Sequence, residues 1–132
     1  MKKLLWTALV AISYLASARA AVQVVVSIKN QIAWLEDGER IIMTSPVCTA
    51  RKGMHTPTGS FEVSEKDTSH ISTIFHVSMP FFMRLSGESF GMHAGYLPGY
   101  PASHGCIRMP QNKAAFFFKN VIVGTPVLIV PN

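Results

Sequence analysis

Short runs of strand-forming residues, separated by turn residues, constrain the fold of this chain more than any other feature. Residues 22–28 are rich in β-branched side chains, which favour strands. Residues 31–35 follow after a short turn and are predicted to return as a second strand. The pair Asp37-Gly38 is typical of a tight hairpin. Residues 40–46 are therefore predicted to return as the third strand of a meander.

The rest of the chain adds further strands and leaves room for one helix. Residues 60–64 and 127–130 are predicted to be strands, and residues 71–92 hold aromatic and Met-rich runs that we interpret as strands or as the wall of a groove. Proline and glycine exclude a helix interior from residues 95–103. Apolar residues recur at near-helical spacing only in residues 111–120. The sequence predicts a mostly-β single domain with one helix near its C-terminus.

The first twenty residues have the pattern of a secretory signal peptide. A basic start precedes the apolar run of residues 4–15, and Ala18 and Ala20 supply the small residues of a cleavage site. The apolar run is shorter than the about 20 residues that cross a bilayer, although an uncleaved anchor or a buried helix remains an alternative. We expect residues 1–20 to be removed, leaving residues 21–132 in the periplasm or cell wall without a stable membrane anchor.

The net charge argues against a nucleic-acid partner. The whole chain carries a formal charge of +5, but three of its basic residues, Lys2, Lys3 and Arg19, lie in the first twenty. Residues 21–132 keep a charge of +2 and no Lys/Arg cluster that could follow a phosphate backbone. We therefore expect no nucleic acid among the partners of this chain.

Cys106 lies in the run Ser-His-Gly-Cys-Ile-Arg-Met, residues 103–109, which suits a reactive thiol. A cysteine attacks as its thiolate, and its usual pKa of about 8.5 calls for a basic or cationic neighbour. If the run is extended, His104, Cys106 and Arg108 share one side. Gly105 would let a substrate carbonyl approach the backbone, whose N–H groups could hold an oxyanion. Arg108 could bind a substrate carboxylate through two parallel hydrogen bonds.

Other interpretations of Cys106 remain open at this point. His93 is a second candidate base, because the loop after it could fold back onto the thiol. Cys106 could instead be a buried, inert cysteine, or could bind zinc together with His93 and His104, although the spacing matches none of the usual paired-ligand patterns. A disulfide between Cys48 and Cys106 would disable the thiol. Residue chemistry alone does not decide among these alternatives.

Residues 92–95, Met-His-Ala-Gly, followed by residues 103–109, resemble the active-site signature of the L,D-transpeptidases (YkuD-type catalytic domain). That signature is an upstream histidine followed by Ser/Thr-x-Gly-Cys. Residues 30–38 are similar to the opening hairpin of the family, residues 56–61 to its Thr-Pro-x-Gly-x-Phe/Tyr loop, and residues 121–130 to its closing strand. The resemblance implies that residues 21–132 form one L,D-transpeptidase catalytic domain with a β-sandwich fold.

The resemblance implies a peptidoglycan L,D-transpeptidase that uses no cofactor. The thiolate, here Cys106, attacks the diaminopimelate carbonyl of a stem peptide, releases the terminal D-alanine and passes the acyl group to an acceptor amine. His93 corresponds to the catalytic base, which the carbonyl of the next residue, here Ala94, often orients. Gly105 and Cys106 would supply backbone oxyanion contacts, and Arg108 would bind a substrate carboxylate.

The same resemblance leads us to expect further substrate contacts and carbapenem-type inhibitors that acylate Cys106. The expected contacts are Ser103, His104 and Tyr96. The interval between His93 and Cys106 is short for the family, so a compact lid is expected, built from Tyr96, Pro98, Tyr100 and Pro101. An L,D-carboxypeptidase or wall hydrolase with the same site, or a catalytically silent wall-binding domain, remains an alternative.

Overall fold

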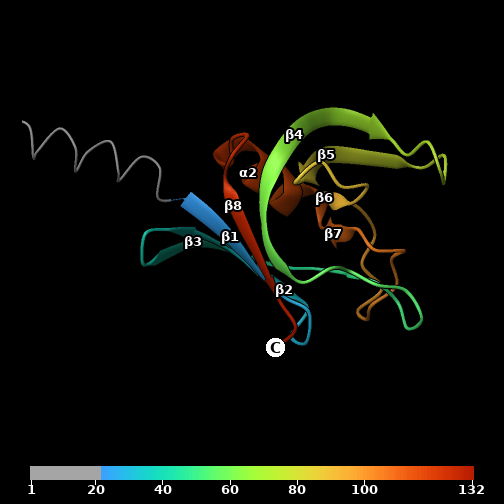
Figure 1. The fold of residues 1–132 in the computed structure, drawn as a ribbon, viewed down its shortest axis with the longest axis horizontal. Helices are drawn as coiled ribbons and strands as arrows, with labels where there is room; N and C mark the ends of the chain where they lie inside the picture. The colour runs from blue at the N-terminus through green and yellow to red at the C-terminus, as the bar shows by residue number, and fades with distance from the viewer. Residues whose placement is uncertain (1–21) are drawn as a thin grey trace, which may run out of the picture.

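Eight strands and one helix make up residues 22–132, the part of the chain that the computed structural model describes (Figure 1). The predicted signal peptide, residues 1–20, lies outside the described residues. Within residues 22–132 no helix is long and apolar enough to cross a membrane. The elements in chain order are β1 (Val22–Ser27), β2 (Ile32–Asp37), β3 (Arg40–Pro46), β4 (Gly59–Ile71), β5 (Ser78–Leu85), β6 (Gly91–Ala94), β7 (Ile107–Met109), α2 (Gln111–Asn120) and β8 (Pro126–Val130). The prediction of a mostly-β domain with one late helix is confirmed.

The strands form one sheet in the order β3-β2-β1-β8-β4-β5-β6-β7. The predicted meander of β1, β2 and β3 is present, and Gly38 takes the positive φ of +64° that its turn requires. The last strand, β8, lies between β1 and β4. β4 arches over the domain in Figure 1, because residues 59–62 pair with β8 whereas residues 63–71 pair with β5. One strand thus belongs to both halves of the sheet.

The two halves of this folded sheet face each other across a single core. Val24 and Leu35 come from one half and Met83 and Ile107 from the other, and all four are fully buried. Helix α2 adds the buried Phe117. Burial of such side chains stabilises the fold by about 1.5–3 kcal/mol each. The β-sandwich expected from the resemblance is therefore confirmed.

The segment after β3 joins the two ends of the sheet. β3 and β7 stand at opposite ends of the strand order, yet Cys48 exchanges two backbone hydrogen bonds of 3.0 Å with Arg108 in β7. Ala50 makes a further bridge with Ser103. Residues 47–50 therefore bring the N-terminal meander against the strand that follows Cys106.

Candidate active site

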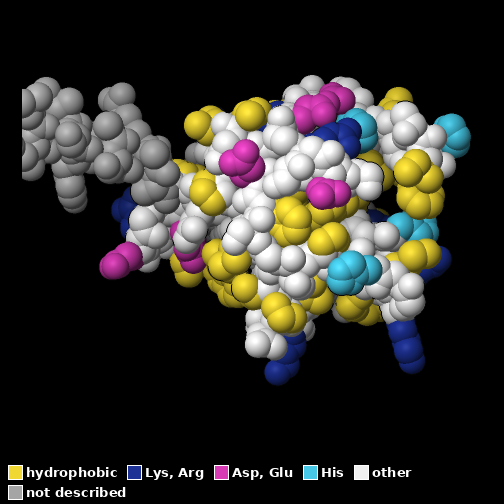
Figure 2. Space-filling view, in the orientation of Figure 1, with side chains coloured by type: hydrophobic (Ala, Val, Ile, Leu, Met, Phe, Trp, Pro, Cys, Tyr) yellow, Lys and Arg dark blue, Asp and Glu magenta, His cyan; other side chains and the backbone are white. Residues whose placement is uncertain are grey.

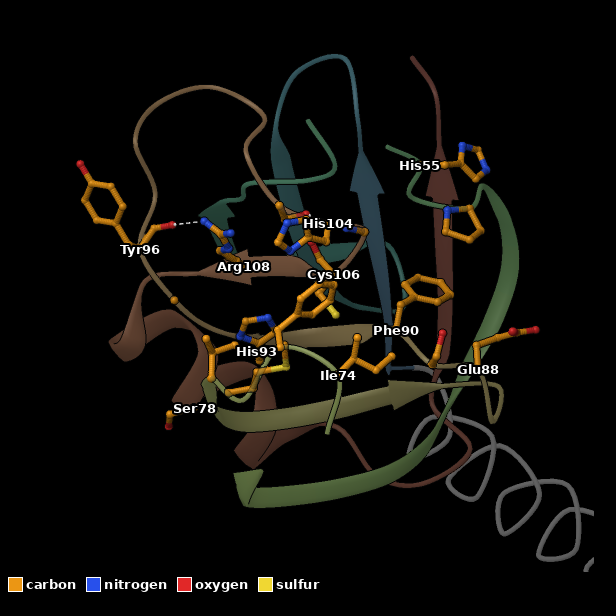
Figure 3. Close-up of a pocket in the computed structure, with 18 residues that line it drawn as sticks. His55, Ile74, Ser78, Glu88, Phe90, His93, Tyr96, His104, Cys106 and Arg108 are labelled. Atoms are coloured by element: carbon orange, nitrogen blue, oxygen red, sulfur yellow. Dashed lines mark hydrogen bonds between the residues drawn. The ribbon is translucent and has the colours of Figure 1, made fainter. Parts of the chain in front are cut away.

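Cys106 and His93 open into one cavity of about 630 Å³ (Figure 3). His93 belongs to β6, and Cys106 comes directly before β7, which pairs with β6 in parallel. The structure brings all the predicted site residues to this cavity: His93, Tyr96, Ser103, His104, Gly105, Cys106 and Arg108. The parallel pairing of two short strands accounts for this assembly.

His93 is oriented as a general base. Its side chain is only 5% exposed, and its Nδ1 lies 2.8 Å from the carbonyl oxygen of Ala94. Since a carbonyl oxygen only accepts, Nδ1 donates, and Nε2 of the neutral ring is an acceptor. Burial lowers the pKa of His93 below its usual 6.5, and the positive charges of Arg108 and His70 lower it further against the opposing Ala94 bond. The ring is therefore neutral near pH 7 and can take a proton.

Cys106 is a free, partly buried thiol that needs such a base. Burial raises the pKa of the Cys106 thiol above its usual value, while a backbone hydrogen bond with Gly91 and the positive charges of Arg108 and Arg84 oppose that shift. The thiol is consequently protonated near pH 7 until a neighbouring group removes its proton. Cys48 is also a free thiol, so the disulfide considered above is absent from residues 22–132.

The turn that carries Cys106 is fixed by two hydroxyl groups. The Ser103 hydroxyl donates to the Cys106 carbonyl at 2.6 Å and accepts from the Gly105 N–H at 3.1 Å. The Thr56 hydroxyl donates to the Gly105 carbonyl at 2.8 Å and accepts from the Ala50 N–H at 3.0 Å. Ser103 thus acts within the turn, and the Gly105 N–H, one of the two expected oxyanion donors, is already bonded.

Thr56 is a supporting residue whose role was not predicted from the sequence. Its loop resembled the Thr-Pro-x-Gly loop of the family, and that resemblance was the available signal. Gly105 has a φ of +147°, and a side chain there would meet the His55 carbonyl oxygen at 3.0 Å. Both the backbone angle and the close contact therefore require glycine at this position.

His104 and Arg108, both expected to contact substrate, line the cavity but also contact other groups of the protein. The His104 ring is exposed and stacks on Phe75 with a centroid distance of 4.2 Å, so it forms part of the outer wall. Arg108 donates from Nη1 to the Tyr96 carbonyl at 3.3 Å and from Nη2 to the Ala102 carbonyl at 3.4 Å; Figure 3 marks the first bond. Part of its guanidinium is therefore occupied by the protein itself.

The wall opposite these residues comes from the β4–β5 connection, residues 72–77. Ile74, Phe75 and Val77 line the cavity, which agrees with the predicted groove wall. Figure 2 shows hydrophobic and histidine side chains gathered on this edge of the molecule. The lid prediction holds for Tyr96, which lines the cavity, and is wrong for three loop residues that do not line it: Pro98, Tyr100 and Pro101. Their loop is instead drawn toward residues 48–49, where the Cys48 thiol donates to the Tyr100 carbonyl at 3.4 Å.

The chemistry available in this cavity is that of a thiol and an imidazole. Within residues 22–132 no group of three or more His, Cys, Asp or Glu side chains is arranged to hold a metal ion. The cavity wall is mainly apolar and carries a few polar groups, as is typical of ligand-binding sites. A polarised carbonyl that reached the sulfur would meet a nucleophile and a base together.

Comparisons with known proteins agree with this geometry. The family model of the YkuD L,D-transpeptidase catalytic domain matches residues 21–129. An L,D-transpeptidase from Stackebrandtia nassauensis is 24% identical, with a TM-score of 0.77 over 85% of this chain and 56% of that one. L,D-transpeptidase 3 from Mycobacterium tuberculosis, solved with a faropenem-derived adduct, is 24% identical, with a TM-score of 0.73 over 83% and 60%.

A third solved structure, an L,D-transpeptidase from Mycobacterium smegmatis, is 20% identical, with a TM-score of 0.76 over 83% of this chain and 58% of that one. The chain thus spans less than two thirds of the length of these solved structures. The comparison with curated proteins found no match. The family model covers most of the chain, and the fold and the cavity agree with it: this chain belongs to the YkuD-type L,D-transpeptidase catalytic domain family.

Proposed function

We propose that this chain is a cysteine-dependent peptidoglycan L,D-transpeptidase with Cys106 as its nucleophile. The observation that supports this most is a thiol sharing a cavity with a buried histidine whose Nδ1 is bonded to the Ala94 carbonyl. That bond leaves Nε2 of His93 as the acceptor, as a base for the thiol proton requires. Family membership supports stem peptides as the substrate class.

In the proposed acylation step, Nε2 of His93 takes the Cys106 proton while the sulfur bonds to the L-centre carbonyl carbon of diaminopimelate. The amide N–H of Cys106 donates to the resulting oxyanion, since the Gly105 N–H is bonded to Ser103. Collapse of this intermediate breaks the carbon–nitrogen bond to D-alanine. The departing nitrogen receives the proton held by His93, and a thioester remains on Cys106.

In the second step an acceptor amine attacks the thioester. His93 takes a proton from the attacking nitrogen and returns it to the sulfur as the carbon–sulfur bond breaks. The product is an amide between two diaminopimelate residues, and the thiol is regenerated. Water in place of the amine would give a tripeptide, so the acceptor decides between transfer and hydrolysis.

Product analysis with a purified stem tetrapeptide tests this proposal. We expect residues 21–132 to release D-alanine and to form the cross-linked dimer, and we expect Cys106→Ala to do neither. Tripeptide without any dimer would overturn transfer in favour of hydrolysis. Activity that survives in Cys106→Ala would overturn the thiol mechanism.

Inhibitor binding provides a second test of the same thiol. We propose that carbapenem-type compounds acylate Cys106, and the faropenem-derived adduct of a structural neighbour supports this. The intact mass of the protein should rise by one inhibitor after exposure. Cys48→Ala should still gain that mass, because Cys48 is buried, and Cys106→Ala should not. Labelling of Cys106→Ala would contradict the assignment.

We also propose that the chain is exported, cleaved after Ala20, and active in the periplasm or cell wall. The signal-peptide pattern of residues 1–20 and the location of stem peptides outside the cytoplasm support this. The mass of the protein recovered from that compartment should correspond to residues 21–132. A mass that includes residues 1–20 would refute the cleavage.

A further inference from the structure

Arg108 occupies the strand that connects the two parts of the active site. In β7 it lies opposite His93 of β6, and its backbone exchanges two 3.0 Å hydrogen bonds with Cys48 on the other side. It comes two residues after Cys106. Its side chain therefore projects from a strand that is held on both edges.

The guanidinium of Arg108 spans the loop between the catalytic histidine and the cysteine. The Tyr96 carbonyl, which accepts from Nη1, stands near the start of that loop, and the Ala102 carbonyl, which accepts from Nη2, stands near its end. The fixed planar fork of an arginine can reach two such acceptors at once, whereas a lysine ammonium is a single point of charge. One side chain thus links both ends of the loop.

The stem of Arg108 is also fitted to the loop, at Gly95. A β-carbon at Gly95 would lie 3.1 Å from Cδ and 3.2 Å from Cγ of Arg108, which is closer than side chains normally pack. Gly95 does not have a positive φ, so the constraint at this position is steric. Substitution of Gly95 by alanine would displace the arginine stem without forcing a strained backbone.

The later part of the loop has its own attachments. The N–H groups of Ala102 and Ser103 both donate to the Thr49 carbonyl, at 3.1 and 3.0 Å, and Tyr100 accepts from the Cys48 thiol. The guanidinium of Arg108 connects this attached part, at the Ala102 carbonyl, with the Tyr96 carbonyl. The β6–β7 pairing aligns the two strands, and the conformation of the loop that leads from His93 to the Cys106 turn depends in addition on these arginine bonds.

We propose that Arg108 is a positioning residue that braces the loop of residues 96–102 and so sets Cys106 against His93, and that it does not act mainly by binding a substrate carboxylate. The inference concerns the same site as the proposed transpeptidase activity and rests on it for its kinetic test. The positive charge of Arg108 also adds to the lowering of the His93 pKa that burial causes, and opposes the rise that burial causes in the pKa of Cys106.

Two variants that keep a positive charge separate the two roles. Gly95→Ala keeps Arg108 and displaces its stem, and Arg108→Lys keeps the charge and loses the fork. Bracing predicts that both lower kcat for D-alanine release about tenfold or more with little change in KM, since small misplacements of reacting groups are costly. Carboxylate binding predicts instead that both keep kcat, with a raised KM in Arg108→Lys, and that result would overturn the proposal.

A neutral reagent makes the test independent of the peptide reaction. Iodoacetamide has no carboxylate, so its rate of alkylation of Cys106 at pH 7 reports on the thiol and its base. We expect that rate to fall several-fold in Gly95→Ala and Arg108→Lys, and to stay unchanged in Arg51→Gln, an exposed arginine outside the cavity lining.

Unchanged alkylation in both variants would overturn the brace. Failure of the wild type to release D-alanine would instead refute the proposed function, while the alkylation rates would still decide the role of Arg108. Thermal unfolding of each variant identifies any that fail to fold, and the remaining one of the two then decides.

Discussion

Two segments border Cys106, and they are held in opposite ways. The loop of residues 95–103, here called the fixed loop, is bonded at several points to β7 and to residues 48–49. The β4–β5 connection, residues 72–77, here called the hairpin turn, is closed by its own hydrogen bonds, among them Ser72 N–H to the Val77 carbonyl at 2.9 Å. Its aromatic contact across the cavity is the stack of Phe75 on His104, the residue that directly follows the fixed loop.

This difference in attachment predicts different roles for the two segments. The fixed loop joins the base to the nucleophile, so its attachments determine the position of the reacting atoms. The hairpin turn contributes apolar side chains that remain partly exposed, such as Ile74 at 69% and Phe75 at 45%. We therefore expect substitutions on the fixed side to reduce the reaction itself, and substitutions in the hairpin turn to change how substrates are held.

The two histidines give the largest contrast. His93→Ala should lower the rate of carbapenem acylation by about 10²–10⁴-fold, because a general base is lost. His104→Ala should cost less than about tenfold, because a stacked pair contributes about 0.5–1.5 kcal/mol. Intact-mass kinetics measure both rates. The opposite ranking would make His104 the base and would reverse the assignment of the two sides.

Gly105, in the Cys106 turn that follows the fixed loop, is the most constrained glycine of the site. Gly105→Ala should lower acylation about 10²-fold, because the new methyl group meets the His55 carbonyl and shifts the Cys106 turn. Gly99→Ala is the matched control: Gly99 also has a positive φ, of +100°, but open space around it. An equal fall in the acylation rate of the two variants would mean that backbone strain, and not the contact with His55, causes the loss of activity.

Ser103 tests the same turn through stability. Ser103→Ala should lower the free energy of unfolding by about 1–3 kcal/mol, because the buried Gly105 N–H loses its acceptor. Urea denaturation of the variant measures this difference. Thr73→Ala, an exposed hydroxyl of the hairpin turn, should change it by less than about 0.5 kcal/mol. A Ser103→Ala protein as stable as wild type would show that the turn does not depend on this hydroxyl.

Phe75 tests the hairpin turn. Phe75→Ala should raise KM for a stem peptide about two- to tenfold with kcat nearly unchanged, because it removes a stacked wall residue and no reacting group. Ile71→Ala, in the exposed end of β4 and outside the cavity lining, should leave both constants unchanged. A large fall of kcat in Phe75→Ala would remove the distinction between the two segments.

The pH dependence is the smallest expected effect. Because burial lowers the pKa of His93, its protonation, which removes the base, should occur below pH 6.5. The rate of carbapenem acylation of Cys106, in which neutral His93 takes the thiol proton, should therefore be kept as the pH falls to 6.5 and decline only below that value. A decline centred above pH 6.5 would contradict a desolvated base.

Much of this arrangement could be predicted from the sequence, because the responsible signals are local. The Asp37-Gly38 hairpin and the helix of residues 111–120 each depend on a few neighbouring residues, and both are confirmed as structural elements. The seven site residues also meet at one cavity, as the resemblance implied.

The remaining features depend on contacts between distant segments. Nothing near Thr56 in the sequence shows that its hydroxyl holds the Gly105 carbonyl, since the partners are separated by the whole of β4, β5 and β6. The predicted position of the lid residues Pro98, Tyr100 and Pro101 was wrong for a related reason. Proline and glycine indicate a loop at residues 95–103, but the direction that it takes depends on Arg108 and Cys48.

The junction between Cys48 and Arg108 has a consequence for how the protein acquires activity. To form this junction, residue 48 must meet residue 108. The chain loses the entropy of this long loop before the two hydrogen bonds of the junction can compensate for it. The Cys106 turn, which Thr56 and residues 48–50 support, is therefore expected to form late in folding. A newly synthesised chain would carry an unassisted thiol until residues 48 and 108 had met, so that Cys106 gains the support of its turn only in the finished domain.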